Sequence, residues 1–531
     1  MKFKHISDIE KATQQGQNEL FRFGVALLFI IGVMLYSSTL EITANSISSG
    51  GLLLIVAAII GGYMAMNIGA NDVANNVGPA VGSQAITMGG ALLIAAVFEA
   101  AGALIAGGDV IDTIRSGIIP PESIADRETF VWLMMSALLA GALWLNFATA
   151  VGAPVSTTHS IVGAVLGAGV MAAGWESVNW GAVLSIFTSW LMSPLLGGIF
   201  AAAFLYFIKR HITYQQDMAA AAVRIVPILV GVMTAAFTSY LLLKGLRKAL
   251  PDFGMASALW TGFSVGLAVF LLLRPLLRSR VAAIENSKEG VNRLFTLPLI
   301  FSAALLSFAH GANDVANAVG PLAAITQTIV GASAIGDHSA MIPPWVMMVG
   351  ALGIVVGLAL FGPRLIRTVG SEITELDKMR ACCIAMSAAI TVIVACQMGL
   401  PVSSTHIAVG GVFGVGFLRE YLKASYARME DEIRAHHAEG DILAVNEFLA
   451  RFKTASLKQK GIMLAELKMQ SKLKLDPANF SKPERKGLKK FYRKELVKRS
   501  QILKIVAAWV ITVPASALVA AGLFYVLRKT M

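Results

Sequence analysis

Residues 67–83 read NIGANDVANNVGPAVGS, and residues 308–325 read FAHGANDVANAVGPLAAI. The shared heptapeptide GANDVAN occurs at 69–75 and again at 311–317, an offset of 242 residues. A second motif follows each copy: GAPVSTTHSIVGAVLG begins at Gly152, and GLPVSSTHIAVGGVFG begins at Gly399. Because two unrelated motifs recur in the same order at similar spacing, we infer that the chain contains an internal duplication.

The composition around these motifs is that of a membrane protein. Of the 531 residues, 56% are hydrophobic and 14% are charged, whereas soluble domains carry about 25% charged residues. Apolar runs long enough to cross a bilayer lie near 21–41, 51–69, 88–107, 130–150, 180–208, 223–243, 256–273, 293–311, 346–363, 381–399 and 503–526. Two Gly-rich runs, 154–172 and 402–418, begin with Pro-Val-Ser and indicate broken or re-entrant segments. We predict an all-α polytopic protein with these 11 spans, two re-entrant hairpins and two inverted repeats.

The duplication divides the chain into six segments. They are an N-terminal cytoplasmic segment with an extra membrane helix (1–50), the first inverted repeat (51–208), central linking helices and loops (209–292), the first part of the second repeat (293–418), a basic cytoplasmic loop (419–502) and the last helix of the second repeat (503–531).

Lysine and arginine gather in one loop. Residues 419–504 hold 21 Lys/Arg against 11 Asp/Glu, so most of the chain's net charge of +12 lies there. Cytoplasmic loops are rich in Lys and Arg. We therefore predict that this loop and the N-terminus lie on the cytoplasmic side of a cell membrane and that the C-terminus lies on the outer side. The helix at 51–69 then runs inward and that at 293–311 runs outward, so the repeats are inverted. The charge therefore indicates topology and not a nucleic-acid-binding surface.

Two further features constrain the class of protein. The first apolar run begins near Phe21 and is too long for a signal peptide. The three cysteines, Cys382, Cys383 and Cys396, fall in one apolar stretch, which excludes a disulfide framework.

The GANDVAN segments place carboxylates and carboxamides at membrane depth. An Asp in hydrocarbon is costly unless it is paired or faces a cavity, so it indicates a functional site. Carboxylate and amide oxygens are hard ligands that suit a small hard cation. We expect the flanking glycines and the prolines Pro79 and Pro321 to break the helices and free backbone carbonyls. The alternative is that these side chains only join helices. The predicted sodium ligands are Asn71, Asp72, Asn75, Asn313, Asp314 and Asn317.

The PVSTTH and PVSSTH segments supply rows of hydroxyls. Proline favours the first helical turn, where backbone N–H groups are unpaired and the helix dipole is positive. Hydroxyls beside such a terminus form a donor-rich pocket that suits a tetrahedral oxyanion. The alternative is a hydrogen bond from each hydroxyl back to its own helix. The predicted phosphate ligands are Ser156, Thr157, Thr158, Ser403, Ser404 and Thr405.

Three further residues are candidates for coupling. His159 and His406 end the two hydroxyl motifs and could bind the anion, relay a proton or fix the hairpin. Glu99 is a lone acid in an apolar span without an acidic counterpart in the second copy, which indicates a cation ligand or a coupling proton site. His310, where the first copy has Ile68, is interpreted as local packing.

The chain resembles the inorganic phosphate transporter (PiT) family, including the type III sodium-phosphate cotransporters. The resemblance covers about 51–420 and 503–526 and includes both motif pairs, FEAAGALIAGGDVIDTIRSGI and AWVITVPAS. It implies two inverted repeats, a homodimer, and symport of phosphate with sodium or protons. It also implies that phosphate binds at the Ser/Thr residues and cations at the Asn/Asp residues. No bound cofactor is expected, because sodium is co-transported.

Three departures from the family pattern are the extra helix at 21–41, the late position of the hydrophilic loop at 419–504, and Ala385 where animal relatives carry a membrane acid. The GANDVAN form resembles the sodium-coupled members more than the proton-coupled bacterial branch. Sodium is therefore the predicted cation.

Several other functions fit parts of the pattern. A proton-coupled phosphate symporter and a sulfate or other oxyanion permease stay open, although an acidic acceptor in the pocket favours phosphate, which can donate a hydrogen bond. A divalent-metal transporter would need more carboxylate or thiolate ligands than one Asp in each copy. An intramembrane hydrolase using Ser156 or Ser403 would not need a duplicated site. We therefore predict a transporter and not an enzyme.

Overall fold

The computed structural model describes residues 2–40, 49–150, 155–215, 217–246, 254–279, 281, 284–330, 342–372, 377–423, 442–454, 462–463, 466–467, 469 and 499–530. Over these ranges the chain is helical and has no β-strand, which confirms the all-α prediction. The chain divides into two compact units, Met1–Val415 with Ser500–Met531, and Gly416–Arg499. Most of the basic loop lies outside the described residues.

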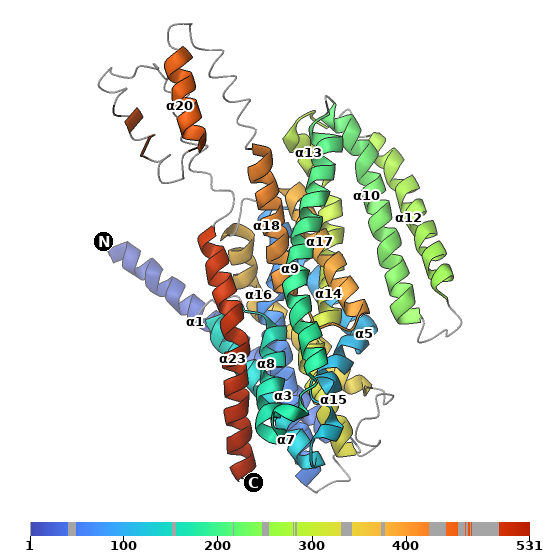
Figure 1. Ribbon diagram of the computed structural model, residues 1–531, viewed down its shortest axis with the longest axis vertical. Helices are drawn as coiled ribbons and strands as arrows, with labels where there is room; N and C mark the ends of the chain where they lie inside the picture. The colour runs from blue at the N-terminus through green and yellow to red at the C-terminus, as the bar shows by residue number, and fades with distance from the viewer. Residues whose placement is uncertain are drawn as a thin grey trace. The chain divides into compact units, whose positions relative to one another are not determined.

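The helices follow one another along the chain as shown in Figure 1. They are α1 (Lys2–Ser38), α3 (Ser49–Asn71), α4 (Val73–Gly82), α5 (Met88–Ala106), α6 (Gly108–Asp112), α7 (Arg127–Ala150), α8 (Thr157–Ala173), α9 (Trp180–Ile208), α10 (Met218–Leu241), α12 (Met255–Arg278), α13 (Lys288–Leu294), α14 (Thr296–Asp314), α15 (Ala316–Val330), α16 (Pro344–Glu372), α17 (Lys378–Gln397), α18 (Ser404–Lys423), α20 (Ile442–Thr454) and α23 (Arg499–Thr530). Short π-helical turns are η1 (Thr113–Gly117), η4 (Lys209–Thr213) and η5 (Leu242–Leu246), and 3-10 turns are η2 (Pro121–Ser123) and η3 (Trp175–Ser177).

Eleven helical segments of the described chain are long and apolar enough to cross a membrane, as the sequence predicts. The two that contain GANDVAN, Gly50–Gly82 with 33 residues and Thr296–Val330 with 35, are among the three longest, because each joins two helices. The helix after the first Pro-Val-Ser motif, α8, has only 17 residues. At 1.5 Å per residue it is shorter than the hydrocarbon core of about 30 Å, which agrees with a segment that begins inside the membrane.

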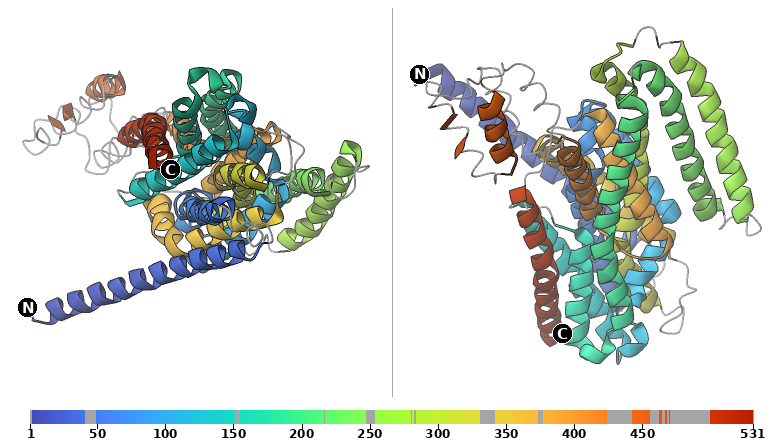
Figure 2. Two further views of the ribbon diagram at one scale, coloured as in Figure 1. Left: turned by 90° about the horizontal axis from the view of Figure 1, so that it is seen from below. Right: turned by 45° about the horizontal axis from the view of Figure 1, so that its top comes forward.

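The two copies of the duplication pack in the same way. The first GANDVAN helix, α3, lies against α16, and the second, α14, lies against α5. A Cβ on Gly69 would overlap the carbonyl oxygen of Ile354, and a Cβ on Gly311 would overlap that of Glu99. Since Gly69 and Gly311 are equivalent in the duplication, Glu99 is the spatial counterpart of Ile354. The helices α10 and α12, which separate the copies in sequence, lie side by side (Figure 2).

Helix α7 begins beside a side-chain cap. The carboxylate of Asp126 accepts hydrogen bonds from the backbone N–H of Thr129 at 2.7 Å and from its hydroxyl at 2.8 Å. These bonds favour the ionised form and hold the pKa of Asp126 below its ordinary value. We expect Asp126→Ala to lower the free energy of unfolding by about 1 kcal/mol at neutral pH.

The stability that Asp126 contributes is present above the pKa of the unfolded chain and is lost as the pH falls through the lower folded value. The difference in melting temperature between wild type and Asp126→Ala in detergent should therefore shrink below about pH 4. Glu122→Ala, an exposed change in the same loop, is the control. A difference that is constant down to acidic pH would contradict the cap.

Candidate functional site

Both GANDVAN helices are interrupted at the motif itself. The first ends at Asn71 and restarts at Val73, and the second ends at Asp314 and restarts at Ala316. Each aspartate therefore lies at or beside a helix break, buried in the protein. Each interruption is one residue long and leaves the local N–H groups bonded, since Asp72 donates to the carbonyl of Ile68 at 3.0 Å and Val315 donates to that of Gly311 at 3.3 Å.

The prediction that Pro79 and Pro321 break the helices is wrong. Both prolines lie inside helices, Pro79 in α4 and Pro321 in α15, several residues after the breaks. A proline nevertheless removes the N–H that would bond to the carbonyl four residues earlier. That carbonyl belongs to Asn75 in the first copy and to Asn317 in the second. The prolines thus release carbonyls at the motif asparagines although the helices continue through them.

The hairpin serines act as helix caps. The Oγ of Ser156 accepts the backbone N–H of His159 at 3.2 Å, and the Oγ of Ser403 accepts that of His406 at 3.3 Å. An N-cap serine satisfies one of the free donors of the first turn. The following residues, Thr157 and Ser404, are therefore the first with hydroxyls directed to other parts of the site. Pro154, at the start of the first motif, lies outside the described residues.

The two aspartates meet the hydroxyls of both hairpins. Thr157 donates to Oδ2 of Asp72 at 2.7 Å, and its Oγ1 lies 3.5 Å from Oδ2 of Asp314. Ser404 and Thr405 lie at longer distances, 3.4 Å from Asp314 Oδ2 and 3.4 Å from Asp72 Oδ1 respectively. Four segments far apart in sequence thus form one site, as the duplication predicts for a membrane carrier.

The motif asparagines bind the hydroxyls of the opposite copy. Asn75 of the first copy donates to Thr405 of the second at 2.9 Å. Asn317 of the second copy donates to Thr157 and Thr158 of the first at 3.1 and 3.3 Å. Asn75 is equivalent to Asn317, and Thr405 is equivalent to Thr158. The two hydrogen bonds are therefore equivalent under the duplication, and each joins one copy to the other. Each hairpin is held by the GANDVAN segment of the other copy.

Asn71 and Asn313 are not used alike. Asn313 is bound to the backbone of Val402, whose carbonyl accepts at 2.6 Å and whose N–H donates at 3.2 Å, and it also contacts the carboxylate of Asp314. Asn71 instead donates to Thr149 of α7 at 2.8 Å. Asn313 therefore fixes the second hairpin, whereas Asn71 is joined to a transmembrane helix and not to the hairpin hydroxyls.

A buried acid–histidine–acid chain adjoins Asp314. His310 Nδ1 lies 2.7 Å from Glu99 Oε2, and His310 Nε2 lies 2.7 Å from Asp314 Oδ2. Asn76 donates to the other oxygen of Glu99 at 2.7 Å. His310 Nδ1 and Glu99 Oε2 are in hydrogen-bond geometry, whereas His310 Nε2 has no hydrogen-bond partner among the described residues and meets Asp314 only as a close polar contact. The sequence interpretation of His310 as a packing residue misses its contact with Glu99. The signal that could have predicted the contact is that Glu99 also lacks a polar counterpart in the other copy.

The other two coupling candidates, His159 and His406, contact each other. The rings of His159 and His406 meet edge to face with centroids 4.4 Å apart, and His159 also lies 3.8 Å from the ring of Trp190. Trp190 donates to the carbonyl of Pro401 at 2.9 Å. These rings therefore join the starts of the two hairpins, which supports the role of fixing the hairpins.

Asp72, His310 and Asp314 form a candidate cation site. One ligand atom from each lies within 4.8 Å of the others, and all three residues are buried. The carboxamide oxygen of Asn317, also buried, has no hydrogen-bond partner among the described residues. A buried acceptor without a donor is unusual, and its lone pairs are available to a cation.

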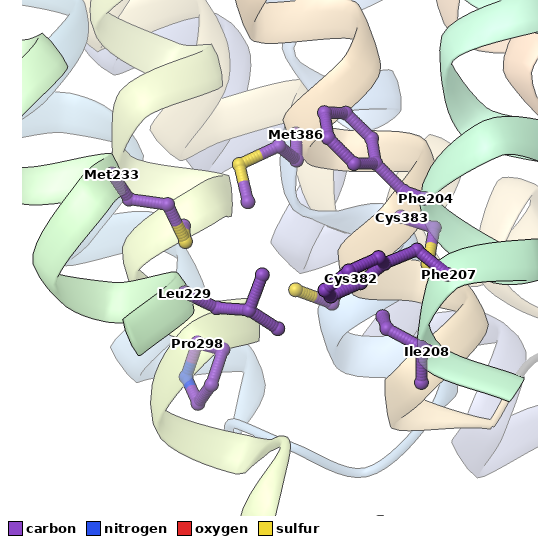
Figure 3. Close-up of a pocket in the computed structure, with 9 residues that line it drawn as sticks. All are labelled: Phe204, Phe207, Ile208, Leu229, Met233, Pro298, Cys382, Cys383 and Met386. Atoms are coloured by element: carbon purple, nitrogen blue, oxygen red, sulfur yellow. The ribbon is translucent and has the colours of Figure 1, made fainter. Parts of the chain in front are cut away.

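Two of the three cysteines, Cys382 and Cys383, lie apart from these residues, whereas the thiol of Cys396 donates to Oδ1 of Asn313 at 3.9 Å. All three are free thiols in the protein interior, as the sequence predicts. Cys382 and Cys383 line a pocket of about 10 Å³ between α9, α10, α14 and α17, with Phe204, Leu229 and Met386 among its other walls (Figure 3). A space of this size holds one water at most, so the pocket is a packing defect in an apolar region.

Comparison with known proteins gives a consistent result. The sequence model described as the Phosphate transporter family matches residues 68–520. A Helicobacter pylori strain J99 protein named "Putative phosphate permease" is 53% identical over 532 residues, 99% of each chain. A Chlamydia trachomatis serovar D protein of the same name is 41% identical over 69% of this chain and 90% of the relative. A solved structure named "The sodium-dependent phosphate transporter" matches with a TM-score of 0.71 and 30% identity, over 90% of this chain and 100% of that one.

The resemblance inferred from the motifs is thus confirmed. The matches extend from the first GANDVAN segment to the last helix and include the whole buried site. The chain belongs to the phosphate transporter family, and it is a transporter and not an enzyme.

Proposed function

We propose that the protein imports inorganic phosphate by symport with sodium. The phosphate would bind the hydroxyls of Thr157, Thr158, Ser404 and Thr405, with Ser156 and Ser403 at the helix starts. Sodium would bind the oxygens of the two GANDVAN segments. The observation that carries this proposal is that hydroxyls of both hairpins lie 2.7 to 3.5 Å from carboxylate oxygens of Asp72 and Asp314.

The coupling of phosphate binding to cation binding follows from the fact that each hydroxyl can donate only one hydrogen bond. Each hydroxyl has one O–H to donate, and that of Thr157 is directed to Asp72. Thr157 can donate to an anion only after Asp72 has gained another partner. A sodium ion beside Asp72 would supply that partner and release the hydroxyl. Cation binding would therefore prepare the anion site.

Charge leads to the same order of events. Two unit charges 4 Å apart interact by about 4 kcal/mol at the effective dielectric of a protein near its surface. A phosphate monoanion or dianion next to two aspartates is repelled by each of them. Cations at Asp72 and Asp314 would turn this repulsion into attraction, so that neither ion binds well alone.

The ligands for such cations are on both copies. Carboxylate oxygens come from Asp72 and Asp314, and the unpartnered carboxamide oxygen comes from Asn317. The carbonyls of Asn75 and Asn317 lack their helical donors because of Pro79 and Pro321. Sodium prefers hard oxygen ligands of this kind. The structural relative is named as sodium-dependent, which supports sodium over protons here.

The proposal includes two repeats of inverted orientation. The offset of 242 residues and the exchanged contacts of Asn75 and Asn317 support a pseudo-two-fold arrangement. An inverted pair with its site between the copies can open alternately to either side. From the Lys/Arg distribution we place the N-terminus and the loop 419–502 in the cytoplasm, in a cell membrane. A homodimer is part of the same proposal.

Uptake into proteoliposomes tests the cation. We expect labelled phosphate to accumulate when sodium is higher outside the vesicles, and to stay near background when choline replaces sodium. The physical reason is the charge of the two aspartates, which only a bound cation offsets. Initial rates at several phosphate concentrations measure the effect.

Two controls separate the alternatives. A pH gradient in sodium-free buffer that drives equal uptake would show proton coupling and overturn the sodium assignment. Excess unlabelled sulfate that suppresses uptake as strongly as unlabelled phosphate would favour an oxyanion permease. Phosphate can donate to Asp72 or Asp314 and sulfate cannot, so we expect sulfate to compete weakly.

A further inference from the structure

A groove runs between α8 and α23 on the outside of the first unit. The backbones of these helices touch at two glycines: a Cβ on Gly163 would meet the carbonyl oxygen of Val513, and one on Gly167 would overlap Ala517. Beside this contact lies a groove of about 340 Å³. Its walls are apolar and come from α8 (Leu166, Val170), the turn η3 (Trp175), the first residue of α9 (Trp180) and α23 (Leu518, Ala521).

One end of the groove has the residues of a membrane interface. Trp175 and Trp180 stack with ring centroids 5.8 Å apart, and the indole N–H of Trp180 donates to the carbonyl of Trp175 at 3.1 Å. Trp180 begins one candidate span, and Lys529 ends another. Tryptophan is enriched where hydrocarbon meets headgroups. The groove therefore runs from this interface into the hydrocarbon layer.

Positive charge continues the groove beyond its apolar part. Arg528 follows Ala521 by seven residues, which is about 10 Å along an α-helix and nearly the same face. Lys529 is the next residue, and both side chains are exposed. Their charged groups lie over the rings of Phe524 and Tyr525, with the guanidinium carbon 6.0 Å and the ammonium nitrogen 5.6 Å from the ring centroids. The groove thus pairs an apolar channel with a cationic end.

We propose that this groove binds one anionic phospholipid. An acyl chain would lie against Val170 and Ala521, and the headgroup phosphate would meet Arg528 and Lys529. A volume of about 340 Å³ suits a narrow linear occupant. A helix of about 10 Å diameter from a second copy needs several times that space over three turns. The site contacts α8, which also supplies Thr157 and Thr158, but the proposal does not depend on which cation is transported.

The duplication suggests a substitution that would fill the groove with a larger side chain. At the offset of the second motif, Leu166 and Val170 of the first copy correspond to Phe413 and Phe417 of the second. Val170→Phe therefore places in the groove a residue that an equivalent helix carries. Ala521→Phe fills it from the other wall. Val519→Phe, on the same helix but not in the groove, is the matched control.

Native mass spectrometry of the purified full-length chain measures the occupant. After detergent washing and addition of dioleoylphosphatidylglycerol, we expect one bound phospholipid on the wild type and on Val519→Phe. Val170→Phe and Ala521→Phe should each reduce the bound fraction at least tenfold. Arg528→Gln with Lys529→Gln should remove the preference for phosphatidylglycerol over dioleoylphosphatidylcholine, while leaving the groove open.

Melting temperatures near that of the control show that the variants are folded. Should either filling variant fail to fold, the other variant and the charge pair still test the site. Equal lipid retention by the wild type and a folded filling variant would overturn the proposal. A wild-type dimer without bound lipid that Val170→Phe converts to monomer would overturn it too, and would assign the groove to a second copy.

Discussion

Asp72→Asn and Asp314→Asn should each lower sodium-dependent phosphate uptake by about 100-fold. An interaction with a charged group contributes up to about 3 kcal/mol, and about 1.4 kcal/mol is a factor of ten in affinity. Asparagine keeps the shape of aspartate and an oxygen that can accept the hydroxyl of Thr157, which donates to Asp72 at 2.7 Å. The substitution therefore removes the charge and leaves the fold.

Initial rates in proteoliposomes and the melting temperature of each variant measure the two effects separately. Glu122→Gln, an exposed acid in the loop before α7, is the control and should transport like the wild type. Normal uptake by folded Asp72→Asn and Asp314→Asn would contradict a cation site at these residues. Loss of uptake in the Glu122 control would show that the assay responds to any lost carboxylate.

His310→Ile should lower the free energy of unfolding by about 3–5 kcal/mol, because it leaves the carboxylates of Glu99 and Asp314 buried without the ring between them. A change of three residues should restore most of this stability: His310→Ile, Glu99→Ile and Asn76→Ala. Their counterparts in the other copy are Ile68, Ile354 and Ala318, so the other half of the protein already carries this apolar set. Thermal unfolding in detergent measures both effects.

The triple variant also tests what the polar set is for. If Glu99 takes part in coupling, the triple variant should be stable and still fail to accumulate phosphate in a sodium gradient. Recovery of uptake together with stability would show that Glu99, His310 and Asn76 serve the fold alone. A triple variant as unstable as His310→Ile would contradict the equivalence of the two copies at this position.

Particular residues show how far the sequence reaches. The pairs Asp72/Asp314 and Thr157/Ser404 can be identified because they occur twice, and in the structure they share one buried site. The sequence misplaces the helix breaks at the prolines, since Pro79 and Pro321 are accommodated inside helices. The sequence shows that an N–H is missing but not whether the surrounding packing lets the helix continue.

The roles of individual polar side chains are harder to predict. Ser156 and Ser403 are in the hydroxyl motifs, yet each caps its own helix, and Asn71 is bound to Thr149. His310 resembles a packing residue because its equivalent is Ile68, and its true partners are 211 residues away and one helical turn away. Partners this far apart follow from helix packing, about which a single sequence carries little information.

The sequence by itself determined the class of protein, the duplication and the residues that we propose to carry the chemistry. Apolar length, scarcity of charge and repeated motifs are local properties, so they can be read along the chain. Only the tertiary structure decided that each hairpin is held by the asparagine of the opposite copy, and that Glu99 and His310 make the two halves unequal. Those contacts exist because helices of the two copies pack against one another, which brings together side chains that no local pattern links.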